Sequence, residues 1–210
     1  GHNRSVADVV EAAIQEDADG IAMSSYQGGH NEYFAYMIDM LKEAGAGHIR
    51  VFGGGGGTIT PEEINELEKY GVEKIYHPND GMKMGLDGMI DDLVKRTIEH
   101  HQESSLPEKI DVDNNLSVAR TLSALEDKAI SDTQLNRLRK EWEMASKNVP
   151  VVGITGTGGA GKSSVTDEIL SRFCQFLPEK KIAVLAVDPT RRRTGGALLG
   201  DRIRMNSLRN

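Results

Sequence analysis

Residues 156–163 read GTGGAGKS, which matches the phosphate-binding loop pattern G-x-x-x-x-G-K-[ST] in full. The apolar residues 150–155 before this loop are predicted to form a buried strand, and residues 164–170 after it begin a helix. The glycines allow backbone N–H groups to converge on a polyphosphate, and the helix N-terminus adds partial positive charge. This arrangement predicts a nucleoside-triphosphate site; a glycine-rich turn without a ligand is the alternative.

The residue types of the loop predict its chemistry. Lys162 is expected to reach the β- and γ-phosphates and to be the catalytic residue of hydrolysis, and Ser163 to offer its hydroxyl to Mg²⁺. The predicted phosphate contacts are Gly156, Gly158, Gly159, Ala160, Gly161, Lys162, Ser163 and Ser164.

A second apolar strand is predicted at residues 182–188, after the loop and its helix. It ends in Asp188, which is well placed to order Mg²⁺ directly or through water. Further along, Asp201 is a candidate second Mg²⁺ contact and Arg204 a candidate phosphate or ribose contact. A solvated surface charge is the alternative for each of these two.

The first hundred residues alternate helices with strands. The predicted strands are residues 20–25, 49–52 and 72–76, and the predicted helices include 5–14, capped by Ser5, 31–44, one opened by Thr60 and Pro61, and 89–101. Strands separated by helices pair in parallel through right-handed crossovers, which predicts an α/β fold with a doubly wound sheet.

The loops after the three strands, residues 24–30, 53–57 and 77–81, are rich in small or polar residues. Ligands of such sheets bind beyond the carboxyl ends of the strands, so the three loops together predict a ligand site at that edge. Each loop alone is also consistent with an ordinary turn.

A polar linker at residues 102–115 is followed by residues 116–147, which carry apolar side chains at helical spacing. We expect a break near Ser131, a new cap at Asp132 or Thr133, and docking of this helical hairpin on the phosphate-loop domain. The predicted domains are 1–103, a helical extension at 104–148, and 149–210.

Composition limits the function classes. The formal net charge of −7 argues against a nucleic-acid partner, and no apolar run is long enough to span a membrane. Cys174 is the single cysteine, so we expect a reducing, cytoplasmic location. The chain lacks an initiator Met, and its phosphate-loop domain is short, so we expect an internal piece of a longer protein.

Two groups of motifs carry a family resemblance. The residues Ser24-Ser25-Tyr26 and Gly54-Gly55 resemble the S-x-L…GG part of the cobalamin-binding domain of acyl-CoA mutases, with Tyr26 in place of the usual Leu. Residues 187–190 and 194–205 resemble the G-protein chaperones that service those mutases. A cobalamin domain joined directly to such a G domain resembles the fused isobutyryl-CoA mutase family.

The resemblance implies a partial flavodoxin-like (Rossmann-like) cobalamin-binding domain, a helical linker and the start of a P-loop GTPase domain. It implies adenosylcobalamin, GTP and Mg²⁺ as cofactors, and a radical rearrangement of isobutyryl-CoA to butyryl-CoA. The GTP-hydrolysing chaperone domain would gate cofactor loading. A mutase domain outside this chain would bind the acyl-CoA, and the whole protein would form a homodimer. The implied cobalamin contacts are Ser24, Ser25, Tyr26, Gly53, Gly54 and Gly55.

Two family motifs are absent from this sequence. No D-x-H-x-x-G motif supplies the axial cobalt ligand, and neither His2 nor His30 is assigned to that role. No N-K-x-D motif reads guanine, so the preference for GTP over ATP is implied by the resemblance alone. The alternatives are a cobalamin-binding metallochaperone GTPase without a mutase barrel, another mutase such as methylmalonyl-CoA mutase, and a flavodoxin-like module for another ligand or none.

Overall fold

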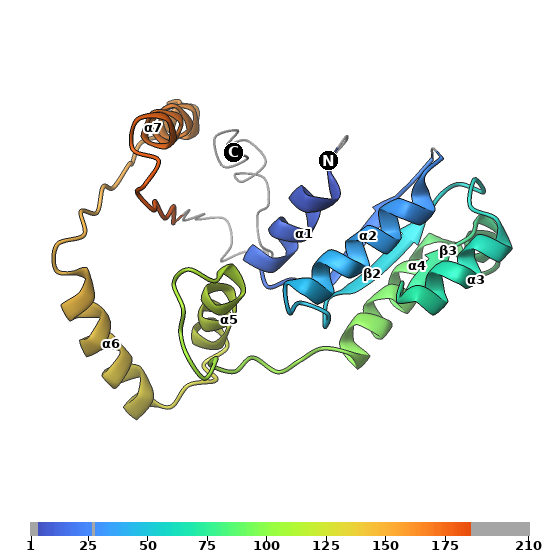
Figure 1. Cartoon of the computed structure of the whole chain (residues 1–210), viewed down its shortest axis with the longest axis horizontal. Helices are drawn as coiled ribbons and strands as arrows, with labels where there is room; N and C mark the ends of the chain where they lie inside the picture. Colours follow the sequence, from blue (N-terminus) through green and yellow to red (C-terminus); the bar gives the residue numbers. More distant parts are fainter. Residues whose placement is uncertain (1–3, 27, 186–210) are drawn as a thin grey trace. The chain divides into compact units, whose positions relative to one another are not determined.

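The computed structural model describes residues 4–26 and 28–185, and the chain divides into two units, Gly1–Glu143 and Met144–Asn210. Unit 1 contains the alternating helices and strands that the sequence predicts (Figure 1), which confirms the α/β class. Its first elements are α1 (Val6–Gln15), β1 (Gly20–Ser24), α2 (His30–Glu43), β2 (Arg50–Gly54), α3 (Pro61–Tyr70), β3 (Lys74–Tyr76) and α4 (Pro78–Glu99).

The described strands of unit 1 form a parallel sheet in the order β1-β2-β3. Ser24 pairs with Gly54, and Gly54 pairs with Tyr76, so the last residues of all three strands lie in register. The segments that follow the three strands therefore leave from the same edge of the sheet, where ligands of parallel sheets bind.

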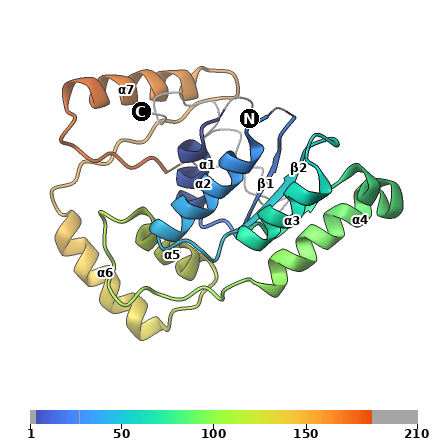
Figure 2. The same ribbon diagram turned by 45° about the vertical axis from the view of Figure 1, so that its right-hand side comes forward.

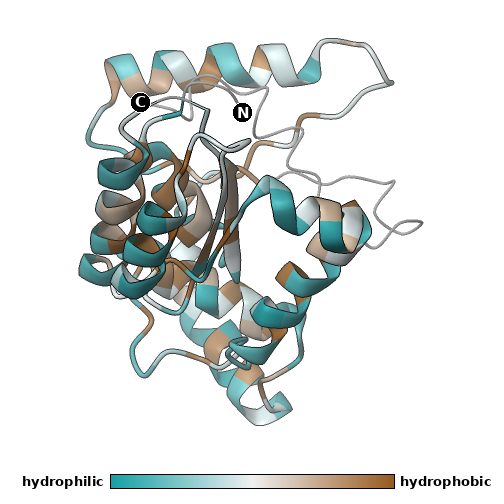
Figure 3. Cartoon of the chain, turned by 90° about the vertical axis from the view of Figure 1, so that its right-hand side faces the viewer, coloured by the Kyte–Doolittle hydropathy of each residue, from teal (hydrophilic) through white to brown (hydrophobic). Residues whose placement is uncertain are grey.

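Helices cover both faces of this sheet. α1, α2 and α3 lie side by side (Figures 1 and 2), and Phe34 of α2 reaches the sheet beside Gly53. α4 covers the opposite face, where Thr97 lies beside Gly20. Brown and teal residues alternate around the helices of unit 1 in Figure 3, as expected for helices that bury one side. The core between the sheet and the first three helices includes Met37, Leu41, Val51 and Ile75.

Local start signals place α1 and α3 where the sequence predicts them. Ser5 caps α1 and Thr60 caps α3, and each side chain accepts a hydrogen bond from the backbone N–H three residues on. The carboxylates of Asp8 and Glu63 accept in return from the cap residues' own N–H groups, which completes two capping boxes.

The predicted loop at residues 77–81 is wrong, because α4 begins at Pro78 rather than at Met89. His77 caps the helix by accepting a hydrogen bond from the Asn79 N–H, and the Asp80 carboxylate accepts from the His77 N–H. Proline at the first helical position and an acid in the first turn are start signals that outweigh the polar, loop-like composition. Gly85 has φ 70° and kinks the helix.

The helical hairpin consists of α5 (Asn115–Glu126) and α6 (Asp132–Ser146). The break lies where it was expected, but the cap is Ser131, whose hydroxyl accepts from the Gln134 N–H. Docking of the hairpin on the phosphate-loop domain stays a prediction, and α5 packs on α1 within unit 1. Ala119 and Ala124 are buried there, and Arg120 pairs with Asp17 at 3.0 Å.

Unit 2 contains the phosphate loop and α7 (Lys162–Phe176), the helix predicted after it. The strand predicted at residues 150–155 is wrong: this segment pairs with no strand in the described part of the chain, and Val151 is 93% exposed. Residues 182–185 likewise form no strand, and residues 186–188 of that prediction lie outside the described residues. Apolar composition favours a strand, but backbone hydrogen bonds to a neighbour are needed to form one.

Candidate functional site

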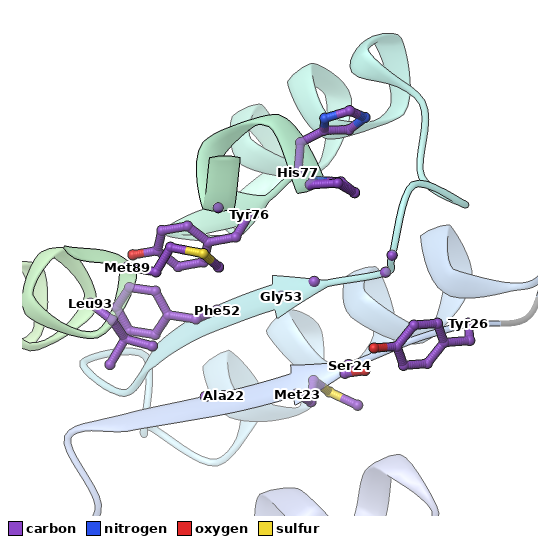
Figure 4. A pocket seen from close by; sticks show the side chains of 15 residues that line it. Ala22, Met23, Ser24, Tyr26, Phe52, Gly53, Tyr76, His77, Met89 and Leu93 are labelled. Carbon is purple, nitrogen blue, oxygen red and sulfur yellow. The ribbon is translucent and has the colours of Figure 1, made fainter. Parts of the chain in front are cut away.

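A cavity of about 540 Å³ lies at the carboxyl edge of the sheet in unit 1 (Figure 4). Its lining comes from the ends of β1, β2 and β3, from the glycine loop after β2, and from one side of α4. The predicted ligand edge is therefore hollow, and the hollow continues between the sheet and α4. A space of this kind accepts a ligand with a substantial apolar part.

Five of the six predicted cobalamin contacts line this cavity: Ser24, Tyr26, Gly53, Gly54 and Gly55. The sixth, Ser25, does not. Its N–H donates to the Gly54 carbonyl at 2.7 Å, and its carbonyl lies 3.2 Å from the Thr58 hydroxyl. Ser25 therefore joins the loops on either side of the cavity.

The glycines at the end of β2 and directly after it are needed for different reasons. A Cβ on Gly53 would lie 2.6 Å from Cζ of Phe34, on the core face of the sheet. A Cβ on Gly55 would lie 2.6 Å from the carbonyl oxygen of Ser25. At Gly54 the nearest atom would be the Tyr76 carbonyl oxygen at 3.7 Å, an ordinary contact. Packing therefore excludes side chains at 53 and 55, whereas at 54 the absent side chain leaves cavity space.

Sequence reasoning missed the apolar wall of the cavity. Phe52 lies on the same side of β2 as Gly54, as alternate residues of a strand do, and this spacing was a usable signal. Met89 and Leu93 come from α4, and no local pattern shows that this part of the helix lies over the sheet edge (Figure 4). The missed lining residues are Ala22, Met23, Phe52, Tyr76, Met89 and Leu93, whereas Gly56, His77, Pro78 and Gly81 lie in the segments predicted to form the ligand edge.

Tyr76 presents its ring to the cavity while its hydroxyl points to α4. The hydroxyl donates to the Asp92 carboxylate at 2.9 Å, and Arg96 Nε donates to the same oxygen at 2.9 Å. Burial raises the pKa of Tyr76 most, and the hydrogen bond to Asp92 raises it further, so the phenol stays neutral. The bond from Arg96 lowers the pKa of Asp92 and keeps it ionised. This chain of contacts fixes the Tyr76 ring as a wall of the site.

The phosphate loop of unit 2 runs directly into the N-terminus of α7. Gly161 caps this helix with φ 78°, a left-handed conformation that favours glycine. The first N–H groups of α7 have no partner within the helix, as at any helix start, so they are available to an anion. Nζ of Lys162 donates to the Thr157 carbonyl at 2.8 Å and so spans the loop. The loop thus brings together a helix N-terminus and an ammonium group, which suits a polyphosphate.

Three predicted residues, Asp188, Asp201 and Arg204, lie outside the described residues. Within residues 4–26 and 28–185, no group of three or more His, Cys, Asp or Glu side chains is arranged to hold a metal ion. In the same described part, no helix is both long enough and apolar enough to cross a lipid bilayer.

Comparisons with known proteins match both sites to families. Residues 1–82 match the B12 binding domain, and residues 118–210 match the methylmalonyl Co-A mutase-associated GTPase MeaB. The GTPase ArgK of Escherichia coli is 49% identical over 59 residues, which cover 27% of this chain and 17% of that protein.

Two longer relatives match along nearly the whole chain. The fused isobutyryl-CoA mutase of Cupriavidus metallidurans is 52% identical over 212 residues, and that of Geobacillus kaustophilus is 50% identical over 219. Each match covers 99% of this chain, which spans about a fifth of the length of these relatives. The chain therefore combines a B12-binding domain with a MeaB-type GTPase domain and is homologous along its length to one segment of the fused isobutyryl-CoA mutases.

Proposed function

We propose that this chain is the cofactor-binding part of an adenosylcobalamin-dependent acyl-CoA mutase, with a built-in GTPase that gates cofactor loading. The observation that carries the proposal is the cavity at the sheet edge, which opens beside Gly54 within the matched B12-binding domain. The phosphate loop before α7, within the matched GTPase domain, supports the second half.

The cavity residues fit part of a cobalamin. Gly54 leaves space where any other residue would place a side chain, and Phe52 and Tyr76 provide flat apolar walls. Ser24 and Tyr26 provide hydroxyl groups at the mouth. Cobalamin supplies the cobalt chemistry when bound, and the residues of this chain bind and orient it. The proposed contacts are Ser24, Ser25, Tyr26, Gly53, Gly54 and Gly55, with Ser25 acting through its backbone bonds.

In the GTPase domain, Lys162 would exchange the Thr157 carbonyl for the β- and γ-phosphates of GTP. Ser163 would offer its hydroxyl to Mg²⁺, with Asp188 and Asp201 as further Mg²⁺ contacts. Arg204 would contact phosphate or ribose. The remaining proposed phosphate contacts are Gly156, Gly158, Gly159, Ala160, Gly161 and Ser164. Catalysis at such a site rests on positioning and charge, and Lys162 is the catalytic residue that we assign.

For the whole protein we propose the rearrangement of isobutyryl-CoA to butyryl-CoA, because relatives named fused isobutyryl-CoA mutases match 99% of this chain. The acyl-CoA would bind to a mutase domain outside this chain, in a homodimer without nucleic-acid or membrane partners. Cys174 is an exposed free thiol, which fits a reducing cytoplasm.

The test is binding of adenosylcobalamin and of Mg²⁺-GTP to the full-length gene product and two variants. Gly54→Leu should weaken cobalamin binding and leave GTP binding unchanged. Lys162→Ala should weaken GTP binding and leave cobalamin binding unchanged. Cobalamin affinity unchanged by Gly54→Leu would place that cofactor elsewhere. No conversion of isobutyryl-CoA by the cofactor-loaded protein would overturn the assigned substrate, and equal affinity for ATP would overturn the GTP preference.

A further inference from the structure

Glu63, near the start of α3, connects the loop before α3 with the first turn of α2. Its Oε2 accepts hydrogen bonds from the Thr60 N–H at 2.8 Å and from the Thr60 hydroxyl at 2.9 Å. Its Oε1 lies 3.3 Å from Nε2 of His30 and accepts from Nδ2 of Asn31, also at 3.3 Å. One carboxylate thus serves both the loop that precedes α3 and the first turn of α2.

The geometry explains why a carboxylate is needed at this position. The N-cap of α2 is Gly29, which has no side chain to cap the helix, and His30 directly after it is only 8% exposed. Glu63 supplies negative charge to this helix start and also completes the capping box of α3. The Thr60 backbone bond, followed by the Thr60 hydroxyl bond, lowers the pKa of Glu63, so it stays ionised near neutral pH.

Thr58 makes a second connection, between the loops that precede α2 and α3. Its hydroxyl lies 2.6 Å from the Gly55 carbonyl oxygen and 3.2 Å from that of Ser25. The connected loops carry Tyr26, next to the β1 end at Ser24, and Gly55, next to the β2 end at Gly54, and all four residues line the cavity. Glu63 does not itself line the cavity. Any effect of Glu63 on a ligand must therefore pass through the loops.

We infer that Glu63 is a positioning residue, which holds the β1–α2 and β2–α3 loops at the spacing that cobalamin requires. This inference rests on the proposed function, because it takes the cavity as the cobalamin site. Preorganised loops bind more tightly because less freedom is lost on binding.

Three variants separate positioning from general stability. Glu63→Gln keeps the shape but replaces one accepting oxygen with an NH₂ group, so Thr60 or the α2 start loses its acceptor. We expect about tenfold weaker binding of adenosylcobalamin to the full-length gene product, the scale of one charge-assisted hydrogen bond. His30→Ala should weaken binding similarly, and His30→Gln, which keeps a donor, should restore most of the affinity.

The matched control is Asp8→Asn, which makes the same type of change in the capping box of α1. Asp8 does not line the cavity, so cobalamin affinity should stay within about twofold of wild type. Unchanged affinity in Glu63→Gln, or an equal loss in Asp8→Asn, would overturn the positioning role.

Hydrogen exchange separates failure of this inference from failure of the proposed function. If the wild-type protein binds no cobalamin, the proposed function fails, but the connection between the loops remains measurable. The amides of Ser25 and Thr58 are bonded to the Gly54 and Gly55 carbonyls. Their exchange should be faster in Glu63→Gln than in Asp8→Asn. Equal exchange in the two variants would refute the inference without reference to any ligand.

Discussion

The neighbouring glycines Gly53 and Gly54 should respond to substitution in opposite ways. A Cβ at position 53 would lie 2.6 Å from Cζ of Phe34 and 2.9 Å from Cδ1 of Ile75. Carbon atoms in good contact are about 3.5–4.0 Å apart, so the overlap at Phe34 is about 1 Å. Phe34 and Ile75 are buried at 0% and 1% exposure and have little room to move. Gly53→Ala should therefore cost about 1–3 kcal/mol of folding free energy.

Position 54 has no such conflict. The nearest atom to an added Cβ is 3.7 Å away, and the backbone there is not left-handed, so Gly54→Leu should change stability by about 0.5 kcal/mol or less. Its side chain would occupy space within the cavity of about 540 Å³. Cobalamin affinity should fall at least tenfold, which corresponds to about 1.4 kcal/mol of binding free energy.

Thermal unfolding without ligand and cobalamin titration by absorbance measure the two effects on the same samples. Gly53→Ala should lower Tm by several degrees. Gly54→Leu should keep a Tm close to wild type and bind cobalamin at least tenfold more weakly. A Gly54→Leu protein that binds cobalamin normally would refute the assignment of the cavity, and an unchanged Tm in Gly53→Ala would refute the packing argument.

Three further changes test other parts of the molecule. Lys162→Ala removes the ammonium that spans the phosphate loop, so GTP turnover should fall by at least tenfold, and full turnover would contradict its catalytic role. Arg120→Met leaves the carboxylate of Asp17, 8% exposed, without its partner and should cost about 3 kcal/mol by chemical denaturation. Asp17→Asn added to Arg120→Met should recover much of that loss, and a purely additive double variant would argue against the pair. The pKa of Asp92 is lowered in the folded state, mainly by Arg96, so its contribution to stability is present at neutral pH and is lost as the pH falls below about 4. Asp92→Asn should therefore flatten the acid side of a Tm-against-pH curve, and an unchanged curve would contradict this.

Features that depend on a few neighbouring residues could be predicted from the sequence. Ser5 and Thr60 were recognised as helix caps because their partners lie three residues away. The helix after the phosphate loop is predicted from another local signal, the residues that directly follow the loop motif. The start of α4 was missed although Pro78 and Asp80 carried the usual signals, because the polar residues around them were interpreted as a loop.

Features that depend on distant segments were harder to predict. Residues 150–155 have the composition of a buried strand, yet a strand exists only where another backbone pairs with it, and composition does not show that partner. The cavity shows the same limit. Its glycine loop was found from a local motif, whereas Met89 and Leu93 are brought to it only by the packing of α4 on the sheet.

The helix α5 shows why a sequence family and a folding unit need not share a boundary. The GTPase match begins at residue 118, inside α5, but α5 buries Ala119 and Ala124 and pairs Arg120 with Asp17 near the end of α1. Removal of α5 would uncover α1 and leave the buried carboxylate of Asp17 unpaired. The stability of unit 1 therefore depends on residues that lie within the GTPase match. α5 is thus needed for the packing of unit 1, although it follows the polar linker at residues 102–115.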